Sequence, residues 1–189
     1  MQMILETARL YLRELRPSDF SALCKILQDK DVMYAYEHAF SDAEVTAWLQ
    51  NQLRRYRENG FGLWAVVHKE TDAVIGQCGL TLQPTPQGEV LEIGYLFQKA
   101  YWHRGYATEA AQACKAYAFN TLRAKEVYSI IRDNNYASQR VAERNGMTAK
   151  GKFTKRYYGM DMPHILYAAE NKAQEKTFGE ETAYDTPNA

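Results

Sequence analysis

The chain has 189 residues, with 23 lysines and arginines against 23 aspartates and glutamates, and three cysteines that lie far apart. This length suffices for one domain with its own core, and the zero formal charge argues against a nucleic-acid-binding surface. The sequence has no paired cysteines, no metal-ligand spacing of histidines and no apolar run of membrane length. These features favour a cytoplasmic protein with no metal, disulfide framework, membrane span or nucleic-acid partner.

The beginning of the chain predicts a strand and then a helix. Apolar residues alternate with polar ones over residues 10–15, which is typical of a strand. The Pro-Ser-Asp sequence that follows is typical of a helix start. We therefore expect the first helix over residues 17–28, with Ser18 or Asp19 as its N-cap.

The next segment predicts a second helix and an antiparallel group of strands. Ser41 and Glu44 have the spacing of a capping box, and Gly60 is placed to end the helix that they begin. A proline- and glycine-containing turn over residues 84–88 is expected to close a hairpin. The β-rich runs in this part of the chain cover residues 63–68, 74–82 and 90–97.

The remainder predicts two more helices that alternate with strands. The expected helices cover residues 107–120 and 135–145, and the expected strands cover residues 127–131, a weaker run from 147, and residues 165–168. Residues 171–189 are polar and nearly free of bulky apolar side chains, so we expect a mobile tail there. Residues 1–170 are then one mixed α+β domain.

The junction between the third strand of the hairpin group and the following helix indicates an anion site. Gly105 allows the backbone to approach a phosphate closely, and the first turn of an alanine-rich helix offers unpaired N–H groups there. A plain glycine turn before a helix explains the same pattern, and it is common. The sequence has neither the GxGxxG spacing of dinucleotide-binding proteins nor a P-loop lysine.

Glu92 is the lone acid in an apolar strand. A carboxylate in such a strand is costly unless it borders a solvated cleft, and burial there raises its pKa toward a useful range for a general base. The alternative is an acid on an edge strand that faces water.

Two segments together resemble the GNAT superfamily of acetyl-CoA-dependent N-acyltransferases, and most closely its ribosomal-protein N-terminal acetyltransferase-like branch. One segment joins residues 92–95 to residues 101–110, and the other covers residues 134–147. The resemblance extends over roughly residues 6–170. It implies an α/β (α+β) fold whose central, mostly antiparallel sheet of about seven strands is flanked by helices and splayed at the cofactor cleft.

The resemblance also implies roles for particular residues. Glu92 would be the general base, and a backbone N–H of Leu96 or Phe97, beside a strand bulge, would polarise the thioester carbonyl. Asn135 and Ser138 would lie beside the pantetheine arm and the sulfur. The acetyl-CoA phosphates would lie against His103, Arg104, Gly105, Tyr106, Ala107 and Thr108.

One familiar group is missing from this pattern. Many members protonate the departing thiolate with a tyrosine at the position that Ala142 occupies here. Ser138 is therefore the candidate for hydrogen bonding the sulfur, and a thiol leaves readily without a strong acid.

The resemblance leaves the acceptor amine open. It places the acceptor pocket at residues 34–40 and 157–164, and both a protein N-terminus and a small amine are compatible with it. A protein acceptor needs an open groove, whereas a small cation favours a closed, acidic pocket. A non-catalytic acyl-CoA-binding module is the alternative function, and a homodimer is an assembly common among such proteins.

Overall fold

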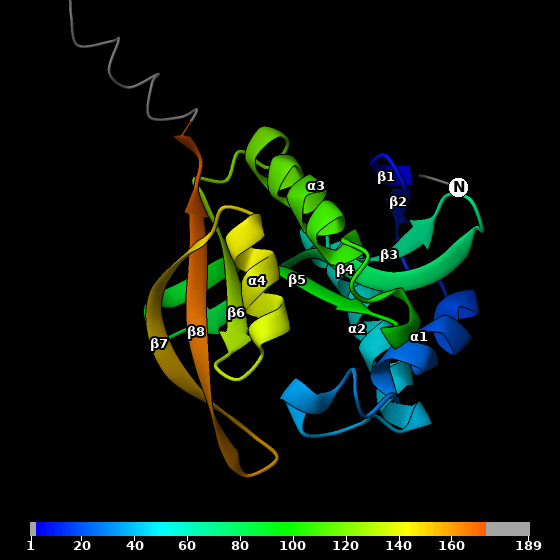
Figure 1. Ribbon diagram of the computed structural model, residues 1–189, viewed down its shortest axis with the longest axis horizontal. Helices are drawn as coiled ribbons and strands as arrows, with labels where there is room; N and C mark the ends of the chain where they lie inside the picture. Colours follow the sequence, from blue (N-terminus) through cyan, green and yellow to red (C-terminus); the bar gives the residue numbers. More distant parts are fainter. Residues whose placement is uncertain (1–2, 173–189) are drawn as a thin grey trace, which may run out of the picture.

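A computed structural model of the protein describes residues 3–172, which form one continuous sheet with helices on both faces (Figure 1). The strands are β1 (Met3–Glu6), β2 (Leu10–Arg13), β3 (Leu63–His68), β4 (Ala73–Thr85), β5 (Gly88–Phe97), β6 (Glu126–Arg132), β7 (Thr148–Tyr157) and β8 (Met160–Glu170). The helices are α1 (Phe20–Leu27), α2 (Asp42–Asn59), α3 (Tyr106–Asn120) and α4 (Tyr136–Arg144), with 3-10 turns at Pro17–Asp19, Tyr34–Tyr36 and Lys99–Tyr101.

The sheet is split between β5 and β6. Its strand order is β1-β2-β3-β4-β5-β6-β8-β7, and every pair is antiparallel except β5 and β6. These two strands are parallel and share the single register pair Glu92↔Tyr128. Beyond that pair they diverge, so the mostly antiparallel, splayed sheet expected from the sequence is confirmed (Figure 1).

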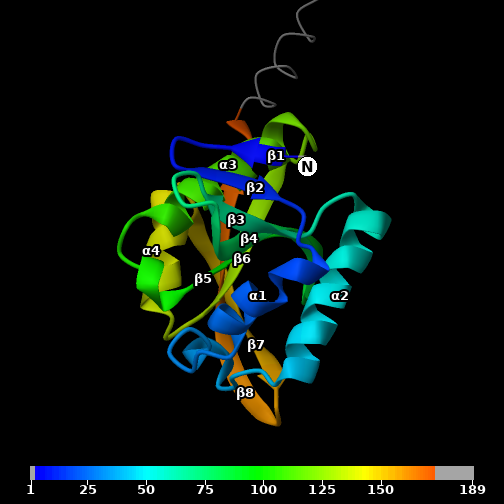
Figure 2. The ribbon, with the colours of Figure 1, turned by 90° about the vertical axis from the view of Figure 1, so that its right-hand side faces the viewer.

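Helices cover the sheet from both sides, with α1 and α2 on one face and α3 and α4 on the other (Figures 1 and 2). All six residues of β3 are buried, because apolar helix faces meet this strand on both sides. The largest fully buried side chains include Trp64 of β3 together with residues of β2, α1, β4 and β5. Among the described residues, no helix is long and apolar enough to cross a membrane.

The capping signals act as the sequence predicts at α2. The Ser41 hydroxyl accepts from the Glu44 N–H at 3.4 Å, and the Glu44 carboxylate accepts from the Ser41 N–H at 2.8 Å. Gly60 ends the helix in the left-handed region, at a φ of 77°. Local chemistry is sufficient for both boundaries.

Two local expectations are wrong, and the sheet has one strand that the sequence does not predict. The sheet has eight strands, because β1 pairs with β2 ahead of the strand expected first. Pro84 continues β4, paired with Glu89, so the hairpin turn is reduced to Pro86 and Gln87. Asp19 does not cap α1 with its side chain, because its carboxylate is held by the Arg13 guanidinium in a buried ion pair. The mobile tail is expected over residues 171–189, of which residues 173–189 lie outside the described residues, while the Asn171 N–H donates to the Lys125 carbonyl at 2.8 Å.

Candidate active site

Two cavities meet where β5 and β6 diverge. One, of about 360 Å³, contains Glu92 and is called the Glu92 cavity; the other, of about 430 Å³, contains Gly105 and is called the Gly105 cavity. Both are lined by Tyr95, Leu96, Asn135 and Ser138. A molecule bound in one cavity can therefore reach a molecule bound in the other across these four residues.

Glu92 lies at the point of the split. Its carboxylate accepts hydrogen bonds from the Thr81 hydroxyl and from the Ile130 backbone N–H, each at 3.2 Å. Burial raises the pKa of the Glu92 carboxyl, while the charge of Lys155, the two hydrogen bonds and the charge of Arg55 oppose that rise. The side chain is half-buried and faces a cavity, so it is not the water-facing acid of an edge strand.

The Gly105 turn presents the N-terminus of α3 to its cavity. Gly105 is the N-cap, at a φ of 80°, which a side chain would strain. The first-turn residues Tyr106, Ala107 and Thr108 line the cavity, and helix geometry leaves their N–H groups without an intrahelical acceptor. His103 also lines this cavity, whereas Arg104 does not: its guanidinium lies over the Tyr101 ring. The role expected for Arg104 belongs to its backbone N–H, and a contact of that N–H with the cofactor stays a prediction.

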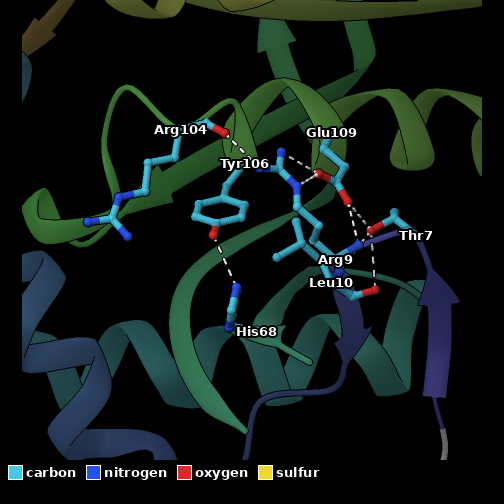
Figure 3. A network of polar contacts seen from close by, with 7 residues as sticks. All are labelled: Thr7, Arg9, Leu10, His68, Arg104, Tyr106 and Glu109. Atoms are coloured by element: carbon cyan, nitrogen blue, oxygen red, sulfur yellow. Dashed lines mark hydrogen bonds and ion pairs between the residues drawn. The ribbon is translucent and has the colours of Figure 1, made fainter. Parts of the chain in front are cut away.

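A polar network formed by the β1–β2 connection and α3 supports the Gly105 turn (Figure 3). The Arg9 guanidinium donates to the Arg104 carbonyl at 2.9 Å, lies 4.4 Å from the Tyr106 ring centroid and pairs with Glu109 at 2.6 Å. Glu109 also accepts from the Thr7 hydroxyl at 2.6 Å. The sequence offers no sign of the pair, because Arg9 and Glu109 are separated by 100 positions.

Asn135 and Ser138 are brought together at the boundary between the cavities. Asn135 Oδ1 accepts from the Ser138 N–H at 3.1 Å, as an N-cap does, and from the Tyr34 hydroxyl at 2.7 Å. The Tyr95 hydroxyl donates to the Ser138 carbonyl at 2.8 Å. Within the part of the chain that is described, the Ser138 hydroxyl makes no hydrogen bond, so it is available to a ligand.

The backbone of β5 distinguishes Phe97 from Leu96. The Gln98 N–H donates to Ile75 of β4, and hydrogen-bonding direction alternates along a strand, so the N–H of Leu96 also faces β4. The carbonyl of Phe97 accepts from Trp102 Nε1 at 2.9 Å, on the opposite side. The N–H of Phe97 therefore faces the split, and that of Leu96 does not.

The strand bulge expected beside these residues is absent from the β4–β5 pairing. The register of the two strands runs without a shift from Gly76↔Phe97 to Thr85↔Gly88. Divergence of β5 from β6, and not a bulge, opens the cleft.

The far wall of the Glu92 cavity combines the two regions expected to hold the acceptor. Tyr36, Phe40, Tyr157, Tyr158 and His164 line it. Glu37, His38 and Asp161 do not, although the His38 ring packs 4.5 Å from that of Tyr158 and so joins the two regions.

Other lining residues were not anticipated from the sequence. Trp48, Asn51 and Arg55 come from one face of α2, and their spacing of three and four positions is a helical signal that could have identified them. Lys155 comes from β7, whose position beside the cavity depends on long-range pairing.

Comparisons with known proteins give one consistent result. The family described as "Acetyltransferase (GNAT) domain" matches residues 9–148. The Bacillus subtilis protein YkkB is 37% identical over 144 residues, which are 76% of this chain and 84% of that protein.

Solved structures agree with the family match. A GNAT-family acetyltransferase from Bacillus anthracis superposes with a TM-score of 0.77 at 24% identity, over 90% of this chain and 99% of its own. The ribosomal L7/L12 α-N-protein acetyltransferase RimL, in complex with coenzyme A, superposes with a TM-score of 0.74 at 18% identity, over 91% and 99%. At these identities the likeness shows the fold.

Proposed function

The chain belongs to the GNAT acetyltransferase family and is an acetyltransferase, and we propose that it moves the acetyl group of acetyl-CoA to a primary amine by direct attack, with Glu92 as general base. One observation carries this proposal: Glu92 lies at the split of the sheet, in a cavity that shares four lining residues with a second cavity at the α3 N-terminus.

The Gly105 cavity has the chemistry that acetyl-CoA needs. Unpaired N–H groups and the positive end of the α3 dipole suit its phosphates, and the glycine permits a close approach of the backbone. RimL, which shares this fold, was solved with coenzyme A bound. The Arg9–Glu109 pair would fix the shape of the turn and not contact the phosphates itself.

The amine would enter through the Glu92 cavity as an ammonium ion. Glu92 takes its proton, directly or through a water molecule, and the neutral amine attacks the thioester carbonyl near Leu96 and Ser138. The Phe97 N–H faces the split and would stabilise the developing oxyanion. Collapse of the tetrahedral intermediate breaks the carbon–sulfur bond, and the Ser138 hydroxyl would hydrogen-bond the departing thiolate. The second proton of the attacking nitrogen passes to the thiolate or to water, which leaves the amide and free coenzyme A.

Two classes of acceptor amine are compatible with the Glu92 cavity. RimL acts, by its name, on the N-terminus of a ribosomal protein, and the same class of acceptor is compatible with this chain. A small amine is the second candidate, because aromatic side chains from two loops narrow the Glu92 cavity.

The single-domain extent of residues 1–170 and a homodimer stay predictions.

Release of free thiol from acetyl-CoA tests this proposal. We expect slow release by the protein alone and faster release with at least one member of a panel of small amines and short peptides, with N-acetylated product identified by mass spectrometry. Binding of acetyl-CoA without product formation from any amine would instead support an acyl-CoA-binding protein.

A further inference from the structure

The Glu92 cavity is rich in positive charge. Among the described residues that line it, Glu92 is the one carboxylate, while Arg55, Arg132 and Lys155 are cationic. Burial lowers the pKa of His164, so this ring is neutral at physiological pH. A pocket built to take a polyamine would show the opposite balance, because each additional ammonium group requires an anionic partner.

The three cations differ in their partners. The charge of Arg132 is already paired within the protein, because its guanidinium forms an ion pair with Glu37 at 2.7 Å and donates to the Ala35 carbonyl at 3.2 Å. Arg55 and Lys155 form no ion pair with a carboxylate within 4 Å in the described part of the chain. The Lys155 ammonium lies 5.9 and 6.0 Å from the ring centroids of Phe153 and Tyr157, and the charges of both cations lower the pKa of Glu92. Neither cation has a carboxylate in direct contact, so each can bind one from a ligand.

Of the two cations, Arg55 has the greater need for a hydrogen-bond acceptor from a ligand. Its side-chain hydrogen bond is a long one, 3.4 Å to Gln52 Oε1, and burial lowers the pKa of its guanidinium. A half-buried guanidinium with so few acceptors is costly unless a ligand supplies them, and its planar fork suits a carboxylate. Arg55 comes from α2 and Lys155 from β7, which lie on either side of the split (Figure 1).

We propose that the acceptor amine also carries a carboxylate, which Arg55 and Lys155 bind while the amine faces Glu92. This inference rests on the proposed acetyl transfer. The shared chemistry has two sources, a free amino acid and the N-terminus of a peptide with an acidic residue near its start. The same cations disfavour a bound ammonium and so assist its deprotonation.

Matched pairs of acceptors test the proposal. One pair is an ω-amino acid and its carboxamide, and the other is a peptide with Glu at its second position and the same peptide with Gln there. The value of kcat/KM is compared per concentration of neutral amine, since the members of a pair differ in amine pKa. We expect the charged member of at least one pair to be favoured about tenfold, and the pair that shows the preference identifies the source.

Variants connect this preference to the two cations. Arg55→Gln and Lys155→Gln should each reduce the preference at least threefold, mainly through KM. Arg54→Gln, one position along α2 and 58% exposed, and Lys152→Gln, exposed on β7, should retain it. No preference in the unaltered protein, or a preference in both cavity variants equal to that of the unaltered protein, would overturn the carboxylate site and leave the acetyl transfer intact.

A second readout separates this proposal from the one on which it rests. If no amine is acetylated, the N-acetylated amino acids and peptides are titrated calorimetrically into the protein in the presence of coenzyme A. Heat that Arg55→Gln abolishes and Arg54→Gln retains would support the carboxylate site. Absence of heat with the unaltered protein would overturn it.

Discussion

The Glu92 carboxylate accepts hydrogen bonds from two donors, but its buried environment opposes its negative charge. Burial raises the pKa of its carboxyl above the ordinary value of a glutamate, about 4.3. Because the folded pKa exceeds the unfolded one, ionisation costs stability as the pH rises through this interval, and below about pH 4 no cost remains. The proposed base is thus expected to be a site of local destabilisation.

Glu92→Gln should therefore melt at a higher temperature than the unaltered protein at pH 7, and the difference should close near pH 4. Each kcal/mol corresponds to about 3 °C in a chain of this length. Differential scanning calorimetry across this pH range measures the difference, and Glu89→Gln, exposed on the same strand, is the control. A gap that widens as the pH falls would contradict the raised pKa.

Ser138 contributes a hydroxyl that has no other role in the described part of the chain. Ser138→Ala should lower kcat for acetyl transfer by less than tenfold, because a thiolate leaves readily without a strong acid. Steady-state thiol release with a saturating amine measures this change. A loss of a hundredfold or more would mean that the hydroxyl is required for departure of the thiolate.

At the scale of elements, the start of α3 offers a matched pair of glycines. Gly105 and Gly60 have φ angles of 80° and 77°, and a side chain strains both positions. A Cβ added at Gly105 would lie 3.5 Å from the Arg9 guanidinium, so Gly105→Glu also disturbs the contacts that hold this turn and should weaken acetyl-CoA binding in a calorimetric titration. Gly60→Glu, at the end of α2, should bind normally. Equal affinity in both variants would move the phosphates away from this turn.

The Arg9–Glu109 network joins the β1–β2 connection to α3. Burial raises the pKa of Glu109, but hydrogen bonds from Thr7 and Arg9 and the Arg9 charge outweigh it, so the pKa lies below the usual range. The resulting stabilisation is complete above the unfolded pKa and is lost as the pH falls through the folded one.

Glu109→Gln should therefore destabilise the protein by about 1–3 kcal/mol at pH 7, and the difference should shrink below pH 4. It should also weaken acetyl-CoA binding, since Arg9 would lose the partner that holds it on the Arg104 carbonyl. Urea unfolding and calorimetry measure the two effects, with Glu143→Gln, exposed on α4, as the control. Loss of stability with unchanged affinity would limit this network to folding.

Local sequence signals predict elements well where the chemistry is local. The capping box of α2 and the left-handed glycines at helix boundaries are contained within a few residues. β1 was missed because its identity as a strand depends on pairing with β2. Asp19 is the N-cap residue of α1 by position, but its carboxylate binds the Arg13 guanidinium and the Arg16 N–H instead of an N–H of α1.

At the scale of the whole molecule, the cleft depends on an arrangement of strands that the residues alone do not reveal. The parallel contact of β5 with β6 is limited to one register pair, and β8 lies between β6 and β7 in the sheet. Family resemblance predicts the split, whereas periodicity predicts only the strands. Arg55 and Lys155 were missed for the same reason, since α2 and β7 meet at one cavity through tertiary structure.

The pH dependence of acetyl transfer tests the central claim most directly. The value of kcat/KM for an accepted amine is measured from pH 5 to 9 for the unaltered protein and for Glu92→Gln. We expect an acidic limb set by a group with a pKa above the ordinary carboxyl range. In Glu92→Gln this limb should be replaced by a rise that follows deprotonation of the amine itself across the whole range, and the rate should be lower by about a hundredfold or more near neutral pH. An unchanged limb and rate in the variant would contradict the assignment of Glu92 as the general base.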